Sequence, residues 1–162
     1  MTYDHEFLAP VLLTSGGMTP HKLALPDEVA GPLREAKVRR IVGTLNGVPF
    51  RLGLHRSREG FSFVALSRDR MRTLGLAAGD LVEVALGADP DPDRVDLGDE
   101  LEAALAADAD ARAVWETLTP GTRRALAHTV TAAKREGTRQ DRAATLTRRL
   151  REGTHDALRR RW

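Results

Sequence analysis

The chain has 162 residues, enough for one domain or for a domain with a smaller appended unit. It contains no cysteine, which excludes a disulfide bond, a thiolate metal site and a cysteine nucleophile. No apolar run reaches the ~18 residues of a membrane-spanning helix, and the first residues lack the basic and apolar regions of a signal peptide, so we expect a cytoplasmic protein.

Charge is unevenly distributed along the chain, although the formal net charge is only +2. Residues 91–116 carry nine acidic residues against two arginines, whereas residues 117–162 carry twelve basic residues against four acidic ones. Such blocks can neutralise each other within the molecule or recruit a charged partner. Both alternatives are open from the sequence.

Strand patterns separated by turn signals occupy the first 88 residues. We expect six strands, at residues 6–14, 21–25, 37–45, 48–55, 61–66 and 81–86. Pro10 lacks an N–H group, which predicts that the first strand lies at an edge or is bulged. A turn is expected at residues 15–20, and Asn46-Gly47 is typical of a type I′ hairpin turn.

Two short helices interrupt these strands. One is expected to begin after Pro26 and the other after Ser67, a favourable N-cap residue. Each helix stands between two strands, so the region contains a weak repeat of strand, helix and strand. Two such units would pack as a pseudo-twofold, six-stranded β-barrel.

The pattern changes to helical periodicity after a linker rich in proline and aspartate. Helices are expected near residues 99–107, 109–118, 120–136 and 139–152. The fold class is therefore α+β, with a β-barrel domain at residues 1–88, a linker at 89–98 and an arginine-rich tail of three to four helices at 99–162.

No catalytic motif is present. The chain lacks a nucleophile elbow, a P-loop and a dinucleotide fingerprint, and its five histidines do not show the spacing of a helical zinc pair. We therefore expect a protein that is not an enzyme and that uses no metal and no cofactor. An enzyme whose site is assembled from scattered residues is the remaining alternative.

Both halves of the chain resemble known bacterial sequences. The hairpin Gly43-Thr44-Leu45-Asn46-Gly47-Val48-Pro49-Phe50, with the later Gly79-Asp80-Leu81-Val82, resembles a domain of unknown function. The tail resembles the YdeI/OmpD-associated, or bacteriocin-protection, family through Leu118, Pro120, Arg123, Arg124, Ala133, Lys134, Thr138, Arg139, Arg142, Leu150 and Gly153. The family usually has aromatic residues where this chain has Leu126 and Thr129.

The resemblance implies an AbrB-like double-split β-barrel. It further implies a role in protection against antimicrobial peptides or bacteriocins, or in a stress response, without naming a reaction. A small-molecule or peptide ligand is the expected partner, and the chain is expected to be a monomer or a homodimer. The candidate ligand-binding residues are Asn46, Phe50, Arg51 and Phe63 in the barrel, and Arg123, Lys134, Thr138, Arg139 and Arg142 in the tail.

A DNA-binding regulator is the alternative function. Some AbrB-like barrels bind DNA, and arginines on neighbouring strands can contact phosphates. The candidate residues for this alternative are Arg39, Arg40, Arg56 and Arg58.

Overall fold

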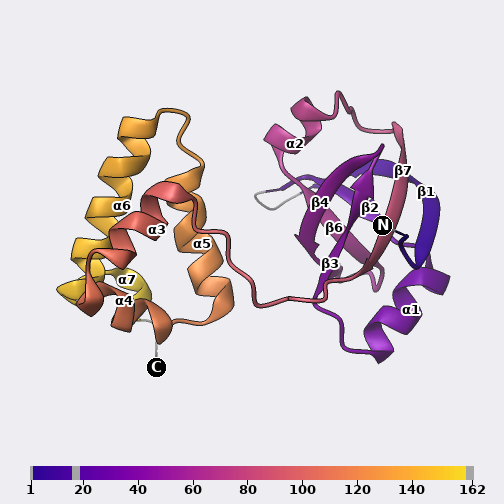
Figure 1. The fold of residues 1–162 in the computed structure, drawn as a ribbon. Helices are drawn as coiled ribbons and strands as arrows, with labels where there is room; N and C mark the ends of the chain where they lie inside the picture. The colour runs from indigo at the N-terminus through magenta and orange to yellow at the C-terminus, as the bar shows by residue number, and fades with distance from the viewer. Residues whose placement is uncertain (1, 16–18, 160–162) are drawn as a thin grey trace. The chain divides into compact units, whose positions relative to one another are not determined.

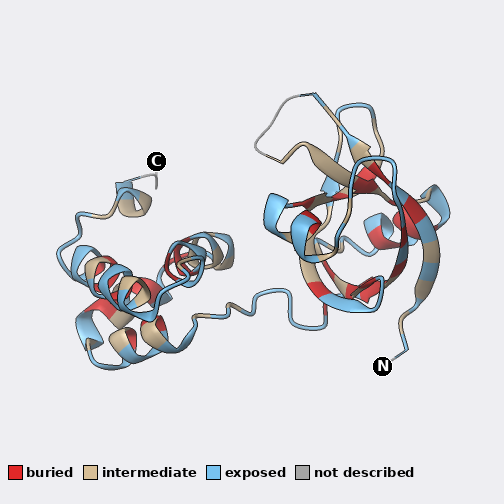
Figure 2. Cartoon of the chain, turned by 90° about the horizontal axis from the view of Figure 1, so that it is seen from above, coloured by how far each residue is buried: buried red, intermediate tan, exposed pale blue. Residues whose placement is uncertain are grey.

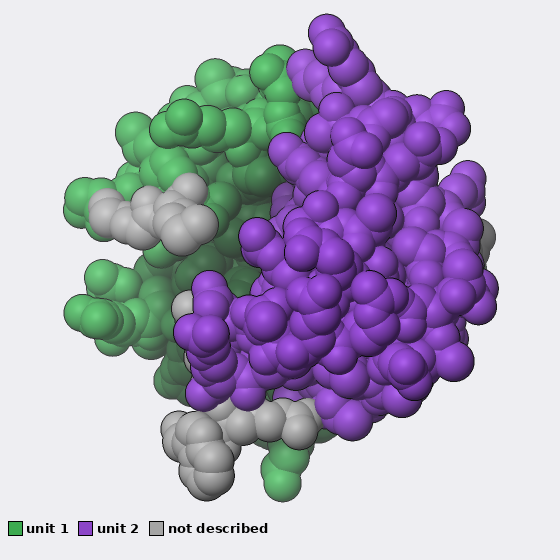
Figure 3. Space-filling model, turned by 90° about the vertical axis from the view of Figure 1, so that its left-hand side faces the viewer, with its two compact units in different colours: residues 1–92 green, residues 93–162 purple. Residues whose placement is uncertain are grey.

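The first part of the chain forms a curled antiparallel sheet, and the second part is helical (Figure 1). The computed structural model describes residues 2–15 and 19–159, so the middle of the turn expected at residues 15–20 lies outside the described residues. The chain divides into a sheet unit, residues 1–92, and a helical unit, residues 93–162 (Figure 3). The α+β class is thereby confirmed.

Seven strands and two helices make up the described part of the sheet unit. They are β1 His5–Leu13, β2 His21–Ala24, α1 Asp27–Glu35, β3 Arg40–Leu45, β4 Val48–Gly53, β5 His55–Arg56, β6 Ser62–Leu66, α2 Arg68–Thr73 and β7 Leu81–Ala88. The strand order is β4-β3-β7-β1-β2-β6-β5.

The expectation of a closed six-stranded barrel is wrong in two respects. The strand expected at residues 48–55 is divided at Leu54 into β4 and the two-residue β5, which gives seven strands. The sheet curls into a half-barrel with β4 and β5 at its two ends. β5 pairs with β6, whereas β4 pairs with β3, so the break at Leu54 separates the two ladders.

Pro10 lies in an inner strand, so the edge position, one of the two alternatives predicted for its strand, is wrong. The first part of β1 pairs with β7, from His5 to Pro10, and the last part pairs with β2, from Val11 to Leu13. Because the pairing with β2 begins only after Pro10, the missing N–H group does not interrupt that ladder.

The internal repeat is visible in the pairing of the strands. The first unit is β2-α1-β3 and the second is β6-α2-β7. Equivalent strands are neighbours, since β2 pairs with β6 and β3 pairs with β7, both antiparallel. Antiparallel pairing of equivalent strands is what an approximate twofold relation between the two units requires.

Alternation of buried and exposed residues places the core inside the curl (Figure 2). In β7, Val82, Val84 and Leu86 are buried, whereas Leu81 and Glu83 are exposed. This period of two is the pattern of a sheet with one apolar face. The predicted hairpin turn is confirmed, because Asn46 and Gly47 both have positive φ angles, of 48° and 78°.

The described part of the helical unit contains five helices, more than the three to four expected. They are α3 Asp99–Ala106, α4 Ala109–Glu116, α5 Pro120–Thr131, α6 Glu136–Arg151 and α7 Asp156–Arg159. The four-residue α7 follows Gly153 and is too short to show a periodicity. No described helix combines the length and the apolar content needed to cross a membrane.

A second apolar core holds these helices together. Leu101, Leu105, Trp115, Val130 and Leu150 are all nearly inaccessible to solvent. Side chains satisfy the free amides at two helix starts, because Asp108 accepts from the N–H of Ala111 and Thr119 accepts from the N–H of Thr122. Each unit of the chain thus has its own core.

The first prediction concerns Gly43, in the middle of β3. A Cβ atom at this position would lie 1.9 Å from the carbonyl oxygen of Ala85 in β7. We expect Gly43→Ala to destabilise the sheet unit by about 3 kcal/mol, because backbone must move to accept the methyl group. Gly31→Ala in α1 is the matched control, since a Cβ there meets nothing within 4 Å. Denaturant unfolding of both variants is the measurement, and equal stabilities would contradict the expected close approach.

Candidate functional site

Two arginines of the helical unit, Arg123 and Arg139, donate to carbonyl groups at or just after the end of the preceding helix, where carbonyl groups lack partners within the helix. Arg123 of α5 donates from Nε to the carbonyl of Trp115 at 3.1 Å and from Nη2 to that of Glu116 at 2.6 Å. Both acceptors are in the last turn of α4. Arg123 therefore completes the C-terminus of α4 and links it to α5.

Arg139 of α6 has the same role after α5. Its Nη1 atom donates to the carbonyls of Ala133 and Lys134, at 3.2 and 3.1 Å. Its Nε atom donates to Oε1 of Glu100 in α3 at 2.7 Å. One guanidinium group thus joins α3, α6 and the segment that follows α5.

Intramolecular neutralisation, one of the two alternatives for the charge blocks, is observed in the helical unit. Among the described residues, ion pairs that connect acidic residues before position 117 with arginines after it include Arg123–Glu116, Arg139–Glu100 and Arg151–Asp108. Part of the positive charge of the tail is therefore balanced by its own acidic segment.

These contacts lower the pKa of two carboxyl groups. For Glu100 the main cause is a hydrogen bond from its own backbone amide, followed by the hydrogen bond from Arg139. For Asp108 the main cause is the N–H of Ala111, and the charge of Arg151 adds to it. Both pKa values lie below their ordinary values of 4.5 and 3.8.

A groove of about 520 Å³ lies beside α6, within the helical unit. One face of α6 forms most of it, because its residues recur at intervals of three and four. The lining residues are Thr129 of α5, Thr138, Asp141, Arg142, Thr145, Leu146 and Arg149 of α6, and His155. We call this surface the α6 groove.

Two side chains of the α6 groove are held in place by the backbone. Arg142 donates from Nη1 to the carbonyl of Thr129 at 2.8 Å, which fixes its guanidinium between α6 and α5. Nδ1 of His155 accepts a hydrogen bond from the N–H of Ala157 at 3.1 Å. A neutral His155 ring therefore carries its proton on Nε2 and can donate from that atom.

The remaining polar groups of the groove are mostly hydrogen-bond donors. Arg149 is exposed, and Thr138 and Thr145 contribute hydroxyl groups. Asp141 is the single carboxylate among the lining residues. Two guanidinium groups and several neutral donors around a concave surface suit a small anion such as a carboxylate or a phosphate.

The residues predicted in the sheet unit are not brought together. Asn46 accepts from the N–H of Glu83 at 2.9 Å and so ties the hairpin to β7. Phe50 lies in the core and is only 6% exposed. Phe63 lies on β6, where Nζ of Lys22 is 4.5 Å from its ring centroid and the ring of His55 is 5.5 Å away.

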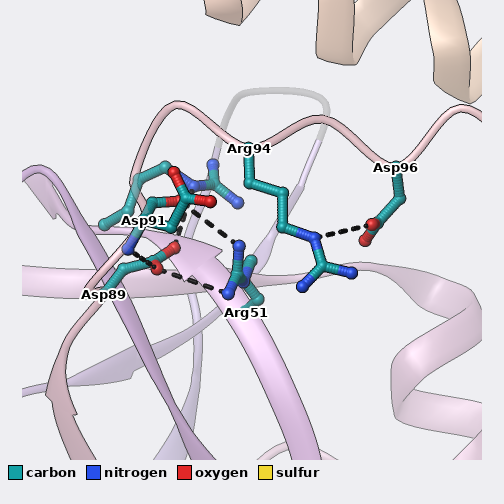
Figure 4. A network of polar contacts seen from close by, with 6 residues as sticks. Arg51, Asp89, Asp91, Arg94 and Asp96 are labelled. Atoms are coloured by element: carbon teal, nitrogen blue, oxygen red, sulfur yellow. Dashed lines mark hydrogen bonds and ion pairs between the residues drawn. The ribbon is translucent and has the colours of Figure 1, made fainter.

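Arg51 takes part in a contact at the end of β7 (Figure 4). Its Nη2 atom is 3.4 Å from Oδ1 of Asp89, whose side chain is fully buried, and its Nη1 atom donates to the carbonyl of Asp91 at 3.3 Å. Nε of Arg40 is 3.8 Å from the other oxygen of Asp89. In the helical unit, Arg94 pairs with Asp96 in the same view. Through their contacts with Asp89, Arg40 and Arg51 therefore stabilise the segment just after β7, where the chain leaves the sheet.

Of the residues predicted in the tail, Thr138 and Arg142 line the α6 groove. Lys134 is exposed, and Arg39, Arg56 and Arg58 of the DNA alternative are exposed as well. Thr129, Thr145, Arg149 and His155 were not predicted as site residues. The spacing of seven residues between Arg142 and Arg149 was a usable signal, because it places both on one helical face.

Within residues 2–15 and 19–159, no group of three or more histidine, aspartate or glutamate side chains is arranged to hold a metal ion.

The second prediction concerns acidification of the helical unit. Because Glu100 and Asp108 have lowered pKa values when folded, their stabilisation is complete above the ordinary values. It is lost as the pH falls below these ordinary values and through the lower folded-state values. Fluorescence of Trp115, which is 3% exposed, reports unfolding in a Trp162→Phe background.

Glu100→Gln should flatten this dependence on pH, and Asp110→Asn, at an exposed position in the first turn of α4, is the control. An unchanged acid transition in Glu100→Gln would contradict the role of the Arg139–Glu100 pair.

Comparison with protein families agrees with the division of the chain. Residues 7–86 match the model of a domain of unknown function, DUF1905. Residues 94–153 match the family described as bacteriocin-protection, YdeI or OmpD-associated. No curated protein and no solved structure gave a significant match. The chain therefore consists of a DUF1905 domain followed by a region of the bacteriocin-protection, YdeI or OmpD-associated family.

Proposed function

We propose that this chain is a non-catalytic binding protein that protects a bacterial cell against bacteriocins or antimicrobial peptides, and that its helical unit binds a small anionic ligand in the α6 groove. The family description of residues 94–153 supports the protective role. The observation that carries the binding role is the groove itself, with Arg142, Arg149 and His155 on its lining.

The distribution of charge supports an anionic ligand. Arg139, Arg123 and Arg151 pair with carboxylates of the acidic segment. The α6 groove contains two further guanidinium groups and one carboxylate, so its lining keeps an excess of positive charge. Hydrogen bonds between a guanidinium and a carboxylate or phosphate are among the stronger polar contacts in proteins.

The arrangement of the groove supports binding without a chemical step. Arg142 is held by the carbonyl of Thr129 before any ligand arrives, and His155 is oriented by the N–H of Ala157. Donors fixed in this way lose little conformational entropy on binding. They hold an anion in one orientation, which is the task of a binding site.

DNA binding through the sheet unit is the second candidate function. It is favoured by the exposure of Arg39, Arg56 and Arg58. Arg40 contributes less to it, because its Nε atom lies beside the buried carboxylate of Asp89. A gel shift with random duplex at about 50 mM salt tests it, since electrostatic affinity for DNA is large at low salt.

The third prediction tests protection with two adjacent arginines of α6. Expression of the chain in a sensitive bacterium should raise the inhibitory concentration for members of a panel of bacteriocins and cationic antimicrobial peptides. Arg149→Ala should remove most of this effect, because loss of a charged hydrogen-bond donor weakens binding of the anion by about tenfold or more.

Arg148→Ala is the matched control, since Arg148 is not one of the groove-lining residues and its Nη1 atom lies 3.8 Å from Oε2 of Glu152. It should protect as well as the parent chain. Absence of protection by the parent chain against every agent, or equal loss in both variants, would contradict the proposal.

A further inference from the structure

One face of the curled sheet combines exposed apolar side chains with carboxylates. Leu8 of β1 is 60% exposed and Leu81 of β7 is 64% exposed, unusually high values for leucine on a sheet. Leu8 is opposite Glu83, and Leu81 is opposite Pro10, so the two leucines are diagonal neighbours on adjacent strands. They therefore form one apolar patch.

Carboxylates border this patch. Glu6 and Glu83 are exposed and point to the same side of the sheet as Leu8, because Leu8 is directly opposite Glu83 and Glu6 is two residues from Leu8. A Cβ atom added at Gly87 would lie 3.1 Å from Oδ2 of Asp4, so the glycine leaves room for a third carboxylate beside this face.

A groove adjoins the patch and includes Leu8 but not Leu81. This groove, of about 490 Å³, is lined by Glu6, Phe7, Leu8, Thr44, Gly47, Glu83, Val84 and Ala85. Two of these residues are acidic and none is basic. Arg51, the basic residue of β4, is paired with Asp89 at the end of β7. The groove thus keeps its negative charge.

We propose that this face, which we call the acidic-apolar face, binds a cationic amphipathic peptide. The lysine or arginine side chains of such a peptide would pair with Glu6 and Glu83, and its apolar side chains would cover Leu8 and Leu81. Charge complementarity selects this occupant, because an anionic chain such as a nucleic acid would be repelled by the same carboxylates. The inference rests on the proposed protective function and names the class of peptide that the sheet unit recognises.

The fourth prediction uses the full chain and a fluorescent synthetic peptide of alternating leucine and lysine. We expect binding at about 50 mM salt that weakens as salt is added, because exposed charges are screened. The double variant Glu6→Gln/Glu83→Gln should bind about tenfold more weakly. Leu8→Ser/Leu81→Ser should also weaken binding, and should do so at high salt as well as at low salt.

Glu28→Gln/Glu35→Gln is the matched control. It makes the same change of charge at two exposed positions of α1, away from the acidic-apolar face, and should leave the affinity unchanged. Equal weakening in both double glutamine variants would overturn the proposal, as would the absence of peptide binding. Sedimentation measures the oligomeric state and so tests whether a second copy of the chain occupies this face instead. If the parent chain is a dimer and Leu8→Ser/Leu81→Ser converts it to a monomer, the face binds a second copy, and the peptide proposal is overturned.

Arg149→Ala separates this proposal from the proposed function. It should leave the peptide affinity unchanged, since Arg149 belongs to the helical unit. If the chain protects cells in a way that depends on Arg149 but does not bind the peptide, the peptide-binding proposal for the acidic-apolar face is wrong and the proposed function stands. If the chain binds the peptide but protects no cell, the proposed protective function is wrong and the peptide-binding proposal stands.

Discussion

Guanidinium groups at the ends of helices organise the helical unit. The last carbonyls of an α-helix have no partner within the helix, and in this chain Arg123 and Arg139 supply that partner for α4 and for the segment after α5. Arg139 also bonds to Glu100, so one side chain links α6 to α3 and to the segment after α5, in addition to the apolar core that these helices share. The α6 groove lies on the flank of the same helix, with Arg142 bonded across to Thr129. The geometry of the groove therefore follows from contacts made by neighbouring arginines.

Arginine thus has two structural roles in the helical unit. Arginines that face the acidic segment stabilise the fold, and arginines on the face of α6 that carries Thr138 and Thr145 line the groove. The residues on which the resemblance to the family was recognised include members of both groups, Arg123 and Arg139 in the first and Arg142 in the second. The sequence does not separate arginines that bond to helix ends from arginines that line the groove, whereas the structure does.

Local signals predicted much of the fold. Asn46-Gly47 indicated its turn because positive φ angles suit these residues, and Ser67 indicated the start of α2 because its hydroxyl accepts from the N–H of Arg70. Features that depend on distant contacts were missed. β5 has two residues and exists because it pairs with β6, and Pro10 is tolerated in an inner strand because β1 changes partner beside it. Of the residues that line the α6 groove, Thr138 and Arg142 were the candidates named from the sequence, since the sequence does not tell an arginine bonded to a carbonyl from one lining a groove.

The two proposed surfaces have opposite charge, which suits a protein with two different ligands. The acidic-apolar face carries Glu6 and Glu83, whereas the α6 groove carries Arg142 and Arg149. Titration of the full chain with inorganic phosphate, followed by amide chemical shifts, is the most direct test of the anion site. We expect saturable shifts at Thr138, Thr145, Arg149 and His155. Shifts confined to exposed arginines of the sheet unit, such as Arg39 and Arg56, or no saturable shift at the groove, would contradict it.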